Sequence, residues 1–164
     1  MKRLMTTILT VLVATIAMAQ VQWSDNQVSY SCDITTIAAK YNQTEHNVAE
    51  QGGWVIIPAS DVKSNGTTKG LLIYHHVFCD EYFAYDLECP HCKENGNVSK
   101  IYMKTNITCR CKCGAEFQNI SQGSNQQTNM TNEGMFWLVQ YNTLMRNGKL
   151  YVSHEDLYTK YESR

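Results

Sequence analysis

Five cysteines crowded into one short segment constrain this chain more than any other feature of its sequence. Cys89 and Cys92 form a C-x-x-C pair, and Cys109, Cys111 and Cys113 follow at alternating positions. If the second segment is a strand, its three thiols project from one face. Two thiols on a turn that faces two thiols on a strand can form a tetrahedral four-sulfur site for zinc or an iron–sulfur cluster. The segment therefore predicts either a metal site or disulfide bridges.

Four of these thiols are better placed for such a site than the fifth. The expected tetrad is Cys89, Cys92, Cys111 and Cys113. The last two lie beside the expected turn at Gly114, where backbone N–H groups can point at sulfur and stabilise a thiolate. Cys109 lies farther up the strand, nearer the core, and is expected to be the spare thiol. His91, inside the C-x-x-C pair, is the candidate substitute ligand.

The sequence Cys89-Pro90-His91-Cys92 also matches the active-site motif of bacterial periplasmic disulfide oxidases. In those enzymes a helix N-terminus lowers the pKa of one thiol. Here the residues that follow, Lys93 to Asn97, have the composition of a loop rather than of a helix. Thioredoxin-like folds also place a later cis-proline against the pair, but the only prolines are Pro58 and Pro90. A thiol–disulfide oxidoreductase therefore stays a minor alternative, beside a metal-free binding module stapled by disulfides.

The N-terminal residues have the pattern of a cleavable secretory signal peptide. Lys2 and Arg3 precede the apolar run Leu4–Ile16, and Ala17-Met18-Ala19 gives the small-x-small pattern of a cleavage site before Gln20. The apolar run is shorter than the roughly 20 residues that cross a bilayer, so we expect no transmembrane anchor after cleavage. We therefore expect export to the periplasm or the extracellular space of a Gram-negative bacterium.

Cys32 and Cys79 stand outside the cluster. In an oxidising compartment cysteines form disulfides by default, so we expect these two to pair with each other. The chain has seven cysteines. Because that number is odd, a pattern made only of disulfides would leave at least one thiol over.

Short apolar segments separated by turn signals predict an all-β domain of short antiparallel strands. Strands are expected at Trp54–Ile57, Leu71–Phe78, Tyr82–Leu87, Val98–Met103, Ile107–Cys113, Phe117–Ile120, Met135–Met145 and Lys149–Ser153. The expected organisation is a signal peptide (1–19), an N-terminal arm (20–52), the β domain (53–153) and a C-terminal tail (154–164). Fourteen basic residues stand against 15 acidic ones, so the composition favours neither nucleic acid nor a membrane surface as a partner.

Two stretches resemble the ligand boxes of Rieske [2Fe–2S] domains. Residues 82–91, ending in Cys89-Pro90-His91, resemble the strand and the Cys-x-His of the first box, and residues 113–117 resemble the end of the second box, Cys-x-x-His-Gly-x-x-Phe. Residues 55–58, 138–141 and 147–152 resemble the opening strand and the closing hairpin of such domains. The resemblance implies a Rieske-like domain over residues 53–153, an iron–sulfur cluster, and electron transfer with a redox or envelope protein partner.

The second box departs from the family pattern. Cys113 stands where the family has histidine, and Arg110 stands where it has cysteine. Three outcomes follow: an all-thiolate cluster, a zinc site in the same pocket, or a Rieske-like fold without metal. We expect an exported Rieske-like protein with a cysteine-rich metal centre, used for electron transfer or for structural metal binding rather than for catalysis of its own.

Overall fold

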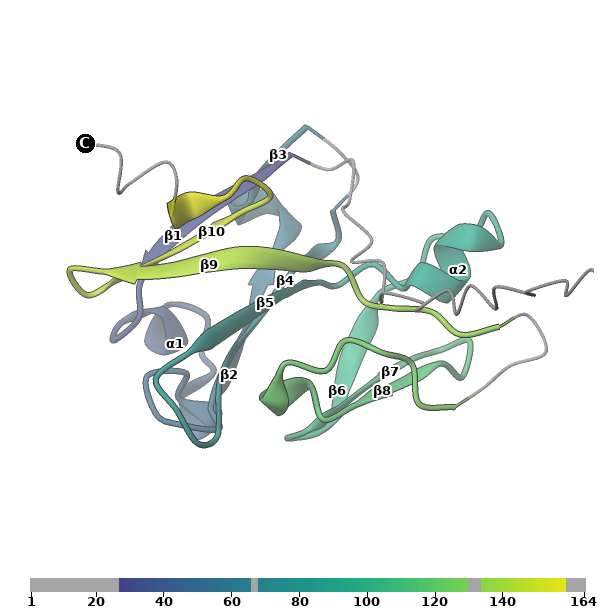
Figure 1. Ribbon diagram of the computed structural model, residues 1–164, viewed down its shortest axis with the longest axis horizontal. Coiled ribbons are helices and arrows are strands. Elements are labelled where there is room, and N and C mark those ends of the chain that lie inside the picture. Colours follow the sequence, from purple (N-terminus) through teal and green to yellow (C-terminus); the bar gives the residue numbers. More distant parts are fainter. Residues whose placement is uncertain (1–26, 66–67, 130–133, 159–164) are drawn as a thin grey trace, which may run out of the picture.

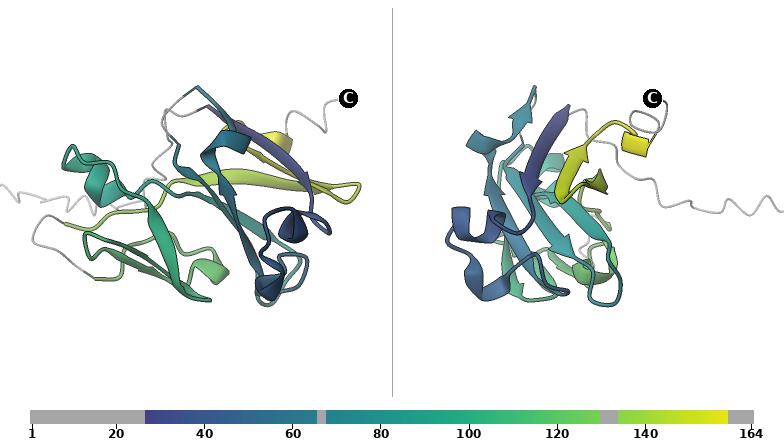
Figure 2. Two further views of the ribbon diagram at one scale, coloured as in Figure 1. Left: turned by 180° about the vertical axis from the view of Figure 1, so that it is seen from behind. Right: turned by 90° about the vertical axis from the view of Figure 1, so that its left-hand side faces the viewer.

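The computed structural model describes residues 27–65, 68–129 and 134–158, and its ribbon is shown in Figures 1 and 2. The predicted signal peptide lies outside these residues. Antiparallel strands dominate the described chain, and its helices are only one or two turns long. The prediction of an all-β domain is therefore confirmed. Among the described residues, no helix is long and apolar enough to cross a membrane.

The strands and helices have the following bounds. The strands are β1 (Val28–Asp33), β2 (Trp54–Pro58), β3 (Lys63–Ser64), β4 (Gly70–His75), β5 (Tyr82–Asp86), β6 (Ile101–Thr105), β7 (Thr108–Cys111), β8 (Glu116–Gln118), β9 (Gln140–Arg146) and β10 (Lys149–Ser153). The α-helices are α1 (Ile37–Lys40) and α2 (Pro90–Glu94), and the 3-10 helices are η1 (Thr44–His46), η2 (Ala59–Asp61) and η3 (Ile120–Gln122).

Seven strands form one sheet that curls into an open half-barrel, in the order β2-β4-β5-β9-β10-β1-β3. The long strand β9 joins the two halves, because it pairs with β5 at Ala84↔Tyr141 and with β10 farther along. Apolar side chains from both halves fill the inside of the curl; among them are Val28, Val55, Ile57, Ile73, Leu150 and Val152, each at most 1% exposed.

The strands β6, β7 and β8 form a second, smaller sheet, which packs against the outer face of β4 and β5. This explains why β4 is buried along its whole length. Leu71 and Ile73 face the inside of the curl, whereas Leu72 and Tyr74 belong to a second apolar cluster under the small sheet. A strand covered on both faces needs an uninterrupted apolar sequence, as residues 71–74 have.

The segment predicted as an N-terminal arm contributes a strand to the large sheet. β1 pairs with β10 from Ser29↔Ser153 to Asp33↔Lys149. Val28 and Cys32 are buried in this strand, whereas the serines between them are exposed. This alternation is that of a half-buried strand, and the exposed serines give the segment its polar composition.

The two main hairpins connect strands that the sequence predicts. β4 and β5 are joined by a loop that contains Asp80 and Glu81, and β9 and β10 turn at Asn147-Gly148. Both turn residues have positive φ, 51° and 75°, which a two-residue turn of this type requires. The strand predicted at Met135–Met145 is shorter than expected, because β9 begins at Gln140.

Candidate metal centre

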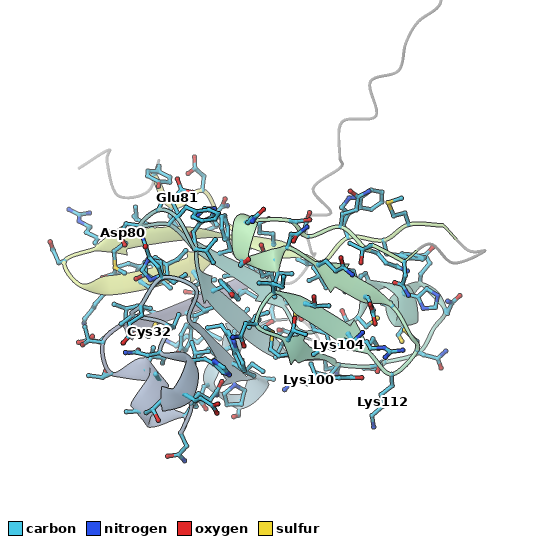
Figure 3. The ribbon with its side chains drawn as sticks, turned by 90° about the horizontal axis from the view of Figure 1, so that it is seen from below. Cys32, Asp80, Glu81, Lys100, Lys104 and Lys112 are labelled. Carbon is cyan, nitrogen blue, oxygen red and sulfur yellow. The ribbon has the colours of Figure 1, made fainter. Side chains whose placement is uncertain are left out.

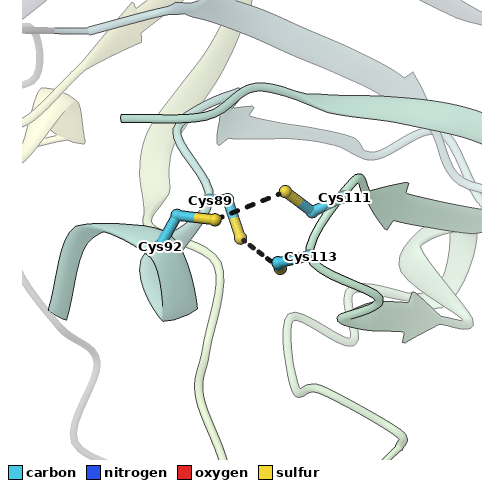
Figure 4. Close-up of side chains that lie close together, drawn as sticks. All are labelled: Cys89, Cys92, Cys111 and Cys113. Carbon is cyan, nitrogen blue, oxygen red and sulfur yellow. Dashed lines mark hydrogen bonds between the residues drawn. The ribbon is translucent and has the colours of Figure 1, made fainter. Parts of the chain in front are cut away.

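Four of the predicted thiols converge at one end of the small sheet (Figure 4). Their sulfur atoms all lie within 4.8 Å of one another, and the group consists of Cys89, Cys92, Cys111 and Cys113. Cys89 Sγ contacts Cys113 Sγ at 3.8 Å, and Cys92 Sγ contacts Cys111 Sγ at 3.6 Å. The group, called here the thiol tetrad, draws two members from each of two chain segments. Four convergent thiols of this kind could hold a metal ion.

A short backbone ladder delivers the first segment of the tetrad. The Cys89 N–H donates to the Ser99 carbonyl at 2.9 Å, and the Ile101 N–H donates to the Leu87 carbonyl at 2.9 Å. These bonds pair residues 87–89, just after β5, with residues 99–101 at the start of β6. The chain that leaves the large sheet is therefore held beside β6 just before the tetrad.

A buried carboxylate fixes the point at which the chain leaves β5. Asp86 is 1% exposed and accepts hydrogen bonds from the Tyr141 hydroxyl on β9 and from the Glu88 N–H, both at 2.7 Å. A buried carboxylate needs such donors, because burial removes it from water. Asp86 therefore ties the turn before Cys89 to the large sheet.

The helix α2 begins at the C-x-x-C pair. Cys89 is the N-cap residue, and Pro90 occupies the first helical position, where a missing N–H leaves no hydrogen bond unmade. The prediction of a loop after the pair is wrong for Lys93 and Glu94, since both belong to α2. The Lys93 N–H donates to the Cys89 carbonyl at 3.0 Å and closes the helical turn. One of the two sequence arguments against an oxidoreductase is thereby removed, and the lack of a proline after residue 90 remains.

The second segment of the tetrad consists of the end of β7 and the turn after it. The Cys111 N–H donates to the Ala115 carbonyl at 2.9 Å, and the Gly114 N–H donates to the Cys111 carbonyl at 3.0 Å. Gly114 has a φ of 99°, which side-chain-bearing residues rarely adopt. No atom lies within 4 Å of the position that a Cβ would take there, so the backbone conformation rather than lack of space requires glycine.

Two of the predicted site residues lie outside the tetrad. Cys109 shares the inner face of β7 with Cys111, but its sulfur lies in the core, 3.4 Å from Met103 Sδ. Burial raises the pKa of Cys109 to about 12. The His91 ring packs edge-on against Phe136, with ring centroids 5.2 Å apart. The tetrad therefore contains no histidine.

Comparison with protein-family models, curated proteins and solved structures finds no match to this chain.

The buried thiols of the tetrad differ in acidity. Burial raises the pKa of Cys89 far above its ordinary value and raises that of Cys92 to about 11. Burial acts on Cys111 in the same direction, but hydrogen bonds with the Ser99 hydroxyl, at 3.2 Å, and with the Cys113 N–H outweigh it and lower the pKa of Cys111 to about 7. The thiolate is the form that binds metal, so Cys111 is the buried thiol most ready to bind near neutral pH.

The small sheet and its loops carry an excess of positive charge, although the whole chain is slightly acidic. Residues 87–129 contain five basic and three acidic side chains. Lys100, Lys104 and Lys112 lie on the surface of this sheet (Figure 3). A divalent ion bound by four thiolates would have a net charge of about −2, opposite in sign to this local excess.

Two residues of this region were not identified from the sequence. Ser99 contacts a tetrad sulfur, but the sequence places it in an expected strand, Val98–Met103, and gives no signal that it belongs to a site. Asp86 is the only charged residue of the strand β5. A carboxylate in such a strand is a sign that it is buried and hydrogen-bonded.

The predicted bridge between Cys32 and Cys79 is not formed. All seven cysteines lie in the described part of the chain, and all are free thiols. Cys32 is buried in β1, whereas Cys79 lies in the loop between β4 and β5, where its N–H donates to His76 Nδ1 at 3.2 Å.

Proposed function

We propose that this protein is a metal-thiolate protein whose tetrad binds one zinc ion as a closed structural site. The observation that supports this best is the convergence of four sulfur atoms within 4.8 Å. Four-coordinate sites made only of cysteine are typical of structural zinc, because no position is left open for water or substrate. Such a closed site favours a structural role for the metal over a catalytic one.

The sulfur spacing favours one ion over a two-iron cluster. Zinc–sulfur bonds of about 2.3 Å in a tetrahedron give sulfur–sulfur edges of about 3.8 Å. The two contacts in the tetrad, 3.8 and 3.6 Å, are close to this edge length. In a [2Fe–2S] cluster each iron takes two thiolates, so thiolates on different irons must lie farther apart than a tetrahedral edge. No two sulfur atoms of the tetrad lie more than 4.8 Å apart, and this spacing fits a single ion better than a two-iron cluster.

Bound at the tetrad, the ion would cross-link two segments that lie far apart in the sequence. Cys89 and Cys92 belong to the turn that begins α2, and Cys111 and Cys113 belong to the β7–β8 turn. The small sheet has only three short strands, and such a sheet depends on its packing for stability. Because the ion binds the folded state, its binding free energy adds to the stability of this part of the molecule.

We further propose that the protein is an exported, Rieske-like domain that acts with an envelope protein partner. The pattern of residues 1–19 supports export, and the two box-like stretches support the family resemblance. The first stretch runs along β5 into α2, and the second covers the β7–β8 turn and the start of β8. The small sheet that holds the second stretch is inserted between β5 and β9, and this arrangement is compatible with the resemblance.

Iron in the same tetrad is the second candidate, with one-electron transfer as the function. Cys113 favours it, because this ligand is exposed and would give a partner direct access to the centre. Metal analysis separates the two candidates.

The test is the metal content and absorbance spectrum of protein purified anaerobically without added metal. We expect about one zinc ion per chain and no visible absorbance; visible absorbance with bound iron would support the second candidate. The matched variants are Cys111→Ser and Cys109→Ser, two buried cysteines on the same face of β7. Cys111→Ser should lose the metal, because a hydroxyl is a poor substitute for a thiolate. Cys109→Ser should keep it. A parent protein without metal, or equal loss in both variants, would contradict the proposal.

A further inference from the structure

All four sulfur atoms of the tetrad lie within 4.8 Å of one another, and two contacts of less than 4 Å bridge the two segments. Cys89 faces Cys113 and Cys92 faces Cys111, at 3.8 and 3.6 Å between sulfur atoms. A disulfide bond is about 2.05 Å long, so each pair would have to close by roughly 1.7 Å. The members of each pair are 24 and 19 residues apart in sequence. The geometry therefore favours bridges between the segments over bridges within the C-x-x-C or C-x-C pairs.

Access to the tetrad is uneven. Cys113 is exposed, whereas the other three thiols are at most 6% exposed. A small oxidant in solvent therefore meets Cys113 first. The thiol that faces Cys113 is Cys89, which is buried beneath it.

We propose that the tetrad is a site of oxidative modification, at which a peroxide forms the bridges Cys89–Cys113 and Cys92–Cys111 and displaces the metal ion. This rests on the proposed function and extends it to the regulation of the same site. In the absence of oxidant the four thiolates hold the ion. After oxidation no tetrad thiolate remains to bind it.

The chemistry requires a peroxide as the oxidant. The Cys113 thiolate attacks a peroxide oxygen, so that an S–O bond forms, the O–O bond breaks, and the departing hydroxide takes up a proton to become water. The Cys89 thiolate then attacks the Cys113 sulfur; the S–S bond forms, the S–O bond breaks, and a second water leaves after protonation. Two thiolates lose two electrons, and one peroxide gains them. A second peroxide oxidises Cys92 and Cys111 in the same way.

Both forms of the site would join the same two segments. The metal ion links the α2 turn to the β7–β8 turn through four sulfur atoms, and the two disulfides link the same turns directly. Oxidation therefore exchanges one cross-link for another, and the small sheet keeps its anchorage. In an oxidising compartment such an exchange would protect the fold while it releases the ion.

The experiment is a hydrogen peroxide titration of the purified protein in a Cys79→Ser background, which removes the partly exposed thiol outside the tetrad. Six thiols remain in this variant, and we expect four to be lost with about two equivalents of peroxide. A chromogenic chelator should report metal release in step with this loss. Peptide mapping without reduction should find Cys89 linked to Cys113 and Cys92 linked to Cys111.

Two further variants test the pairing independently. Cys113→Ser should leave only the bridge Cys92–Cys111, and Cys111→Ser should leave only Cys89–Cys113, whereas Cys109→Ser should behave like the parent. A Cys89–Cys92 or Cys111–Cys113 bridge in the oxidised parent would overturn the inference, as would oxidation of Cys113 without any bridge. If the purified protein holds no metal, the proposed function fails, but mapping of the oxidised protein still decides the pairing.

Discussion

Replacing Tyr141 by Phe tests how the large sheet positions the turn that carries Cys89. The Tyr141 hydroxyl donates to Asp86 Oδ2 at 2.7 Å, and the two residues are 4% and 1% exposed. A hydrogen bond to a charged group contributes about 1.5–3 kcal/mol, and a buried acceptor that loses its donor adds a desolvation cost. Asp86 would keep the Glu88 N–H at 2.7 Å and a longer bond from the Lys69 N–H at 3.4 Å. We therefore expect Tyr141→Phe to lower the free energy of unfolding by about 1.5–3 kcal/mol.

Tyr85→Phe is the matched control. The Tyr85 hydroxyl is also buried and donates to the Ile120 carbonyl at 3.0 Å, so the same atom is removed from a neutral acceptor. Such a bond contributes about 0.5–1.5 kcal/mol, which places the control below Tyr141→Phe. The difference between the two variants isolates the effect of the carboxylate.

The assay is equilibrium urea unfolding, followed by far-ultraviolet circular dichroism, of both variants and the parent under the same metal conditions. The midpoint should shift without a change in the slope of the free energy against urea concentration. A Tyr141→Phe variant that loses no more stability than Tyr85→Phe would refute the reasoning, because the hydrogen bond to Asp86 would then contribute no more free energy than a bond to a neutral carbonyl.

Three further predictions concern single residues. In metal-free protein, Cys111 should titrate with a pKa of about 7, seen as a rise in ultraviolet thiolate absorbance that Cys111→Ser removes; no such step would contradict it. Because this pKa is lowered from 9.0, the stability that Cys111 contributes is fully present above pH 9.0 and is lost as the pH falls through about 7, which urea unfolding at several pH values would measure. Gly70→Ala should lower the melting temperature strongly, since its φ is 112° and a Cβ would lie 2.3 Å from the Ile57 carbonyl oxygen; an unchanged melting temperature would count against the described β2–β4 contact. Gln43→Ala should remove the two hydrogen bonds, at 3.0 and 2.8 Å, that cover Ile56 on the edge strand β2, and light scattering should then show more self-association than in the parent.

The strands and hairpins of the fold could be predicted from the sequence because local signals specify them. Asn147-Gly148 permits the positive φ angles of the β9–β10 turn, and the apolar run in β4 indicates a strand covered on both faces. β1 could not be recognised in the same way. Its exposed serines make the segment polar, and its pairing partner β10 lies more than 100 residues away in the sequence.

Membership of the tetrad could be predicted, but its surroundings could not. Alternation places all three later cysteines on one face, and only nearness to the Gly114 turn distinguishes Cys111 and Cys113 from Cys109. The sequence does not show that α2 begins at this pair. On a helical turn, Cys89 and Cys92 lie three residues apart and share a face, whereas His91 points elsewhere. The sequence also holds no information on which thiols face each other, because the approach of α2 to the β7–β8 turn decides it.

X-ray absorption spectroscopy of the metal, in protein purified anaerobically without added metal, tests the central claim most directly. We expect four sulfur ligands at about 2.3 Å around a single zinc ion, and no second metal ion within bonding distance of the shared sulfur atoms. A metal–metal neighbour would indicate an iron–sulfur cluster instead. Nitrogen or oxygen ligands in place of a thiolate, or a protein without bound metal, would contradict the four-thiolate site.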